Sequence, residues 1–88
     1  MTNKNKIKIL IEIAEDNNVL VERGNMIRWD GSIGSQFRYN IKKNVIRFEC
    51  RKLSSTLWTR ISSHSIKDLN INLWTGNMNL VNKKQNRY

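Results

Sequence analysis

Apolar and polar residues alternate along much of this chain, most clearly in residues 35–52, SQFRYNIKKNVIRFECRK. If Lys43 and Asn44 form a two-residue turn, this segment folds into a β-hairpin. The apolar and aromatic residues then face one another on one side, in the pairs Ile41 with Ile46, Tyr39 with Phe48, and Phe37 with Cys50. The other side is polar, with the pairs Asn40 with Arg47, Arg38 with Glu49, and Gln36 with Arg51. The pattern predicts an apolar face and a basic face; a slightly longer loop is the alternative, because Lys-Asn is a poor turn dipeptide.

Four isoleucines occupy alternate positions near the start of the chain, in residues 6–14, KIKILIEIA. This alternation places them on one face of a strand, and we favour a strand because β-branched side chains suit a pleated surface. A helix is the alternative, since apolar residues also recur at helical spacing, at Ile7, Leu10, Ile11 and Ala14. The asparagines that follow this segment are suitable helix caps.

A second hairpin is predicted in residues 68–82, DLNINLWTGNMNLVN. Gly76 and Asn77 supply the turn, and Leu73 then faces Leu80 across the two strands. In this register Ile71, Leu73, Met78 and Leu80 share one face, and Trp74 points to the opposite face.

A third hairpin is predicted at Gly24 and Asn25, which would turn VLVER back onto MIRWD and bring Leu20 near Trp29. The glycine, aspartate and serine content of residues 30–35, DGSIGS, indicates a loop. The serine-flanked segment SSTLWTRISSHS fits either a short helix or one more strand.

Together these elements predict a single domain over residues 1–82 that is mainly β, or α+β with one short helix. The expected architecture is a small antiparallel meander or barrel-like sheet of five to seven short strands. Residues 83–88 are predicted to form a flexible basic tail. Exposed edge strands in such a sheet also allow a homodimer formed by edge pairing.

The formal net charge of the chain is +9, and almost all of it comes from the second part of the sequence. Residues 1–30 carry five lysines and arginines against five acids, whereas residues 31–88 carry eleven against two. A one-sided cationic excess on a small domain produces a positive potential, whose commonest partner is a polyanion. The charge distribution therefore favours nucleic acid, either DNA or RNA, as the partner.

The basic face of the 35–52 hairpin is the predicted binding site. Its cationic residues are Arg38, Lys42, Lys43, Arg47 and Arg51, with Lys52 and Arg60 joining from the edge. These side chains would contact phosphates and release condensed counterions, which gives salt-sensitive binding with little sequence preference. Trp58 and Trp74 are the candidates for stacking on bases. The competing interpretation is that the charges of a solvent-facing strand serve solubility and edge protection.

The segment NVIRFECRK, residues 44–52, resembles the second catalytic strand of the PD-(D/E)xK nucleases. In that family an apolar strand carries a metal-binding acid and, two residues later, a lysine on the same face. The resemblance makes Glu49 the acid and puts Arg51 in the place of the lysine. The preceding strand SQFRYNI has no acid, so Asp30 upstream is left as the second carboxylate that two-metal chemistry needs. An ion pair between Glu49 and Arg38 across the hairpin is the simpler interpretation.

Other chemistry has little support in the sequence. Cys50 is the only cysteine, and no signal peptide or membrane span is expected, so we expect a cytoplasmic location. His64 and Cys50 are too few ligands for a metal site, and no cofactor is expected. We therefore expect a small nucleic-acid-binding protein without catalytic activity. The alternative is a phage- or plasmid-type inhibitor or accessory protein that binds an acidic surface of a host protein.

Overall fold

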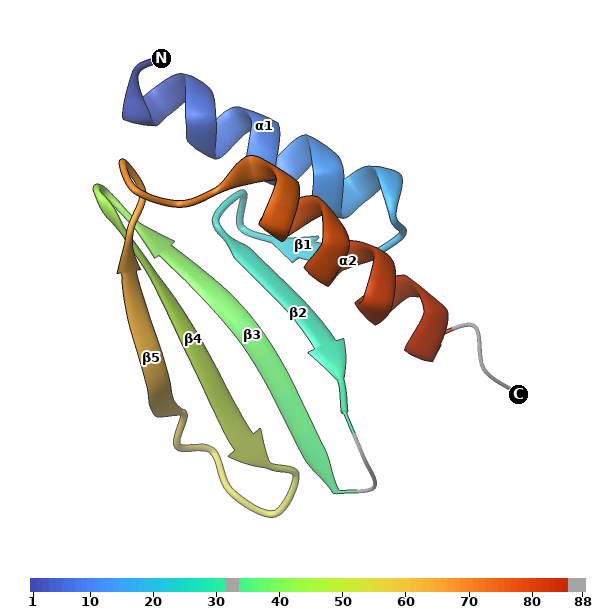
Figure 1. The fold of residues 1–88 in the computed structure, drawn as a ribbon. Coiled ribbons are helices and arrows are strands. Elements are labelled where there is room, and N and C mark those ends of the chain that lie inside the picture. The colour runs from blue at the N-terminus through green and yellow to red at the C-terminus, as the bar shows by residue number, and fades with distance from the viewer. Residues whose placement is uncertain (32–33, 86–88) are drawn as a thin grey trace.

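The computed structural model describes residues 1–31 and 34–85. The elements are α1 (Asn3–Asp16), β1 (Leu20–Glu22), β2 (Met26–Asp30), β3 (Ser35–Lys42), β4 (Val45–Lys52), β5 (Thr59–Ser65) and α2 (Ile71–Gln85). The five strands form one antiparallel sheet in which strands consecutive in sequence are neighbours. Both helices lie on the same face of this sheet (Figure 1). The predicted antiparallel meander is confirmed, in an α+β fold that has two helices.

The central hairpin of β3 and β4 has the predicted register. Every expected cross-strand pair is present, from Ile41 with Ile46 to Gln36 with Arg51, and the turn consists of Lys43 and Asn44 alone. Lys43 has a φ of +45°, a left-handed conformation that is uncommon for a residue with a long side chain. The longer loop is therefore excluded, and the two faces of the hairpin are as the sequence predicts.

The strand that we favoured for the first isoleucine-rich segment is wrong, because residues 3–16 form α1. The residues at helical spacing are those that face the core: Leu10 and Ala14 are fully buried, and Ile7 and Ile11 pack against them. A helix with this apolar stripe can cover one face of a sheet. This packing favours the helix, although the apolar residues of the segment fit the strand period and the helix period equally well. Thr2 caps the helix, since its hydroxyl accepts a hydrogen bond from the backbone N–H of Asn5 at 3.2 Å.

The hairpin predicted for residues 68–82 is also wrong, because α2 continues through the expected turn at Gly76 and Asn77. The buried residues of α2 recur at helical spacing: Trp74, Met78 and Val81. Leu73 and Leu80, which the hairpin would have paired, are instead exposed. Burial of the large Trp and Met side chains outweighs the cost of about 1 kcal/mol for a glycine inside a helix.

The hairpin of β1 and β2 is confirmed, but its register differs by one residue from the prediction. The loop has three residues rather than two, so Leu20 pairs with Arg28 and not with Trp29. Arg23 and Gly24 in this loop have φ values of +54° and +72°, and the glycine adopts this conformation without steric cost.

Three further segments are the serine-flanked segment, the loop at 30–35 and the C-terminal tail. The serine-flanked segment forms a strand, β5, which is one of the two alternatives considered. Within the predicted loop at 30–35, residues 32–33 lie outside the described residues. Of the predicted tail, residues 83–85 belong to the last turn of α2, and residues 86–88 lie outside the described residues. Neither described helix is long and apolar enough to cross a membrane.

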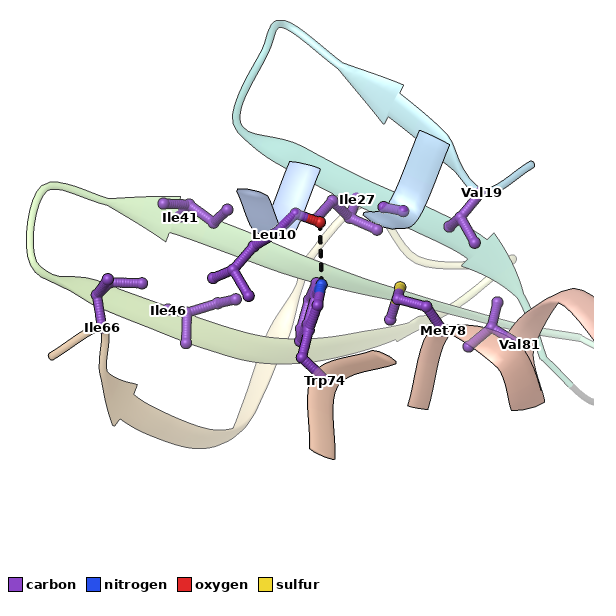
Figure 2. Close-up of a cluster of buried hydrophobic side chains, with 10 residues drawn as sticks. Leu10, Val19, Ile27, Ile41, Ile46, Ile66, Trp74, Met78 and Val81 are labelled. Atoms are coloured by element: carbon purple, nitrogen blue, oxygen red, sulfur yellow. Dashed lines mark hydrogen bonds between the residues drawn. The ribbon is translucent and has the colours of Figure 1, made fainter. Parts of the chain in front are cut away.

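The hydrophobic core lies between the two helices and the sheet (Figure 2). Its buried residues are Leu10, Ala14, Val19, Ile27, Ile41, Ile46, Ile66, Trp74, Met78 and Val81. Trp74 of α2 has 2% of its surface exposed, and its indole Nε1 donates a hydrogen bond to the backbone carbonyl of Leu10 in α1 at 2.9 Å. This bond satisfies the polar atom of a buried indole and joins the two helices directly.

We expect Trp74→Phe to lower the free energy of unfolding by about 1–3 kcal/mol, because it removes this hydrogen bond and part of a fully buried ring. Urea unfolding followed by circular dichroism measures the change. Trp29→Phe is the matched control, since Trp29 is half-buried and makes no side-chain hydrogen bond within the described residues. Equal losses of stability in the two variants would contradict a special role for the Trp74 hydrogen bond.

Candidate nucleic-acid interface

The face of the sheet opposite the helices is covered by neither of them (Figure 1). Because side chains alternate along a strand, the registers determine which residues lie on this face. We name this surface the open face; it consists of Leu20, Glu22, Met26, Arg28, Asp30, Gln36, Arg38, Asn40, Lys42, Val45, Arg47, Glu49, Arg51, Trp58, Arg60, Ser63 and Ser65. It contains most of the residues predicted to bind nucleic acid.

Six of these side chains are cationic and three are acidic, and the ion pairs divide the cations into two groups. Arg28 and Arg38 stand directly opposite each other on β2 and β3, which would be unfavourable for two like charges. Each instead has its own carboxylate: Arg28 contacts Glu22 at 3.1 Å, and Arg38 contacts Glu49 at 2.8 Å. The other four cations, Lys42, Arg47, Arg51 and Arg60, have no carboxylate partner within the described residues.

The pair of Arg38 and Glu49 is the least exposed charged contact of the open face. Glu49 is 7% exposed, and its carboxylate accepts hydrogen bonds from Arg38 Nε at 2.8 Å and from Asn40 Nδ2 at 3.4 Å. The ion pair proposed from the sequence is therefore confirmed. It neutralises an acid in the middle of the face, so this carboxylate no longer opposes the approach of a phosphate.

A hydrogen bond positions the Arg51 side chain, and no carboxylate of the described residues forms an ion pair with it. Its Nε donates to Gln36 Oε1 at 2.9 Å, and Gln36 Nε2 in turn donates to Asp30 Oδ1 at 3.0 Å. The Arg51 guanidinium also lies 4.8 Å from the ring centre of Trp58, and that of Arg38 lies 4.1 Å from it. Trp58 is partly exposed, and because both guanidinium groups contact its ring, it joins the two arginines into one aromatic and cationic contact surface.

The remaining predicted residues do not share one cluster with these. Lys43 lies in the turn before β4 and Lys52 at the other end of β4, so their Cα atoms are roughly 25 Å apart at about 3.3 Å per residue. The stacking role predicted for Trp74 is wrong, because this residue is buried in the core and its indole N–H already donates a hydrogen bond to Leu10. The structure thus brings Arg38, Arg51 and Trp58 together. Lys42, Arg47 and Arg60 lie on the same face, whereas Trp74 does not belong to the predicted site.

The aromatic residues of the central strands lie on the opposite face, as the hairpin register predicts. Trp29, Tyr39 and Phe48 are in mutual contact, with ring centres 5.0–6.0 Å apart, and Phe37 joins them. Burial raises the pKa of Tyr39 above its ordinary value of 10.0, as expected for a phenol packed among apolar rings. This cluster stabilises the sheet and does not contribute to the open face.

The arrangement of acids differs from what the nuclease resemblance implies. Glu49 and Arg51 share a face, but Asp30 is two strands away from Glu49, which separates their Cα atoms by about 12 Å. The carboxylate of Glu49 is engaged by Arg38 and Asn40. No group of three or more histidine, cysteine or acidic residues with metal-binding geometry occurs in residues 1–31 and 34–85.

Comparison with protein-family models, with curated proteins and with solved structures finds no match for this chain. What the open face does must therefore be argued from its own residues.

Removing Arg38 should leave Glu49 buried without its counter-charge. We expect Arg38→Met to lower the free energy of unfolding by about 3 kcal/mol, whereas the double variant Arg38→Met with Glu49→Leu regains most of that stability. A double-mutant cycle of urea unfolding measures both effects. If the double variant is as unstable as Arg38→Met alone, the pair is not what stabilises this part of the sheet.

Proposed function

We propose that this protein binds nucleic acid through the open face and has no catalytic activity of its own. One observation supports this proposal above all: four cations lie on a face that neither helix covers, and none of the four has a carboxylate partner in the described part of the chain. The three acids of that face are each engaged, two by arginines and Asp30 by Gln36. A surface arranged in this way has a net positive potential that favours a polyanion.

Binding should be dominated by phosphate contacts. Each cation that neutralises a phosphate releases condensed counterions, so the logarithm of the binding constant falls with the logarithm of salt concentration. Contacts from Lys42, Arg47, Arg51 and Arg60 predict a slope of about −3 to −4. Because this contribution does not depend on the base sequence, we expect similar affinities for unrelated sequences of the same length.

A second candidate function has one observation in its favour. Leu53 and Leu57, in the segment between β4 and β5, are 61% and 77% exposed. Leu53 follows the cationic Lys52 in the chain, and Leu57 lines one surface pocket together with Lys52. Exposed apolar side chains beside a cation are suited to docking on an acidic protein surface. In that case the protein would act as an inhibitor or accessory factor, and binding would depend on these leucines rather than on the open face.

Charge reversal on the open face tests the proposed function. Arg47→Glu with Arg60→Glu should lower the affinity for a labelled oligonucleotide at least about tenfold, because two phosphate contacts become repulsive. Neither arginine side chain has a hydrogen bond or ion pair within the described residues. Since Arg60 stands opposite Glu49 in the sheet, circular dichroism checks that the fold of the variant remains intact. Fluorescence anisotropy at two salt concentrations gives the affinity and the salt slope.

The matched control is Lys4→Glu with Lys8→Glu, which makes the same change in net charge on the exposed surface of α1. This variant should keep most of the affinity. Equal losses in both double variants would show that binding follows net charge and not the open face. Absence of binding to DNA and RNA at low salt would contradict the proposed function.

A further inference from the structure

Three of the unpaired cations lie on successive strands in a regular order. Lys42 is on β3, Arg47 is on β4 two residues further along the sheet, and Arg60 is on β5 two residues further again. From one cation to the next, the position moves about 4.8 Å across the sheet to the next strand and about 6.6 Å, or two residues, along the strands. The Cα atoms of successive cations are therefore about 8 Å apart. The three cations therefore form a diagonal row across the open face, which we name the cationic diagonal.

The cationic diagonal leads to Trp58. Trp58 is two positions before Arg60 in the chain, and its ring centre lies 4.1 Å from the Arg38 guanidinium and 4.8 Å from that of Arg51 on the open face. Trp58 is partly exposed, unlike Trp74, and its partner Arg51 has no acidic partner in the described residues. The row of cations thus ends at an aromatic and cationic surface of the kind on which a nucleobase stacks.

We infer that the open face selects single-stranded over double-stranded nucleic acid. The phosphates follow the cationic diagonal, and a base stacks on the Trp58 and Arg51 pair. This inference rests on the proposed function and specifies which form of nucleic acid is bound. The flexible backbone of a single strand can follow a diagonal across a twisted sheet, and its unpaired bases are free to stack on a side chain.

The shape of the protein does not suit the grooves of a duplex. The axes of the five strands span about 19 Å, whereas the major groove of B-DNA is about 12 Å wide and admits one helix or a two-stranded ribbon. The turn of the central hairpin is also held within the fold. Asn44 accepts hydrogen bonds from Asn3 Nδ2 at 2.9 Å and, through its carbonyl, from the Ile66 N–H at 2.8 Å. Neither the open face nor this hairpin turn is therefore free to enter a groove.

A duplex could still contact the cations from outside a groove, but it would lose the contact with Trp58. Its bases are paired and stacked on one another, so no base face is available to the ring. The difference between the two forms is therefore expected at Trp58, whereas Arg47 and Arg60 contribute to both.

The experiment compares one labelled oligonucleotide of about a dozen nucleotides, free and annealed to its complement, at matched salt. The wild-type protein should bind the single strand on the order of tenfold more tightly than the duplex, which is the contribution of one stacked base. Trp58→Ala should remove most of this preference, lowering affinity for the single strand and leaving that for the duplex unchanged. Trp58→Phe should keep the preference, because it retains an aromatic ring.

Loss of folding in Trp58→Ala would be detected by circular dichroism, and in that case Trp58→Phe and Arg60→Gln replace it. Arg60→Gln should reduce the salt slope for the single strand by about 0.7, the value of one phosphate contact. Equal or tighter binding of the duplex by the wild-type protein overturns this inference and leaves the proposed function in place. Absence of binding to either form overturns both.

Discussion

The hydrogen bond from Trp74 to the carbonyl of Leu10, with the apolar side chains around it, joins two helices that are far apart in the sequence. Both helices are thereby held on one face of the sheet, where their apolar residues and those of the strands are buried together (Figure 2). Since side chains alternate along each strand, the polar residues of the same strands must lie on the other face. An uncovered polar face is therefore a direct consequence of how this small domain buries its core.

The distribution of charge on that face depends on a few pairs. Arg28 and Arg38 face each other, and each is neutralised by an acid of a neighbouring position, Glu22 and Glu49. In these pairs the negative charges of Glu22 and Glu49 are neutralised, so they no longer reduce the positive potential of the open face. The arginines of the open face therefore have two roles: some neutralise acids and support the sheet, and others remain available to a ligand.

The parts of the structure that were predicted correctly are those that depend on local sequence. The turn at Lys43 and Asn44 fixes the pairing of β3 with β4, and from this pairing the basic face and the contact of Arg38 with Glu49 follow. A helix was only the alternative for residues 6–14 and was not predicted for residues 68–82, because the apolar residues of both segments satisfy the strand period as well as the helix period. Only the need to cover one face of the sheet decides between these periods. The wrong role for Trp74 came from that ambiguity. The place of Arg60 on the open face depends on the register shift between β4 and β5, which local sequence does not determine.

The central claim is that the cations of the open face, and not the net charge of the chain, contact the ligand. Nuclear magnetic resonance tests it most directly, by titrating the isotope-labelled protein with a short single-stranded oligonucleotide at low salt. The account predicts shifts of the arginine Nε–H signals of Arg47 and Arg60 and of the neighbouring amides in β4 and β5, with the amides of α1 and α2 unchanged. Shifts centred on the helices, or none at saturating ligand, would contradict it.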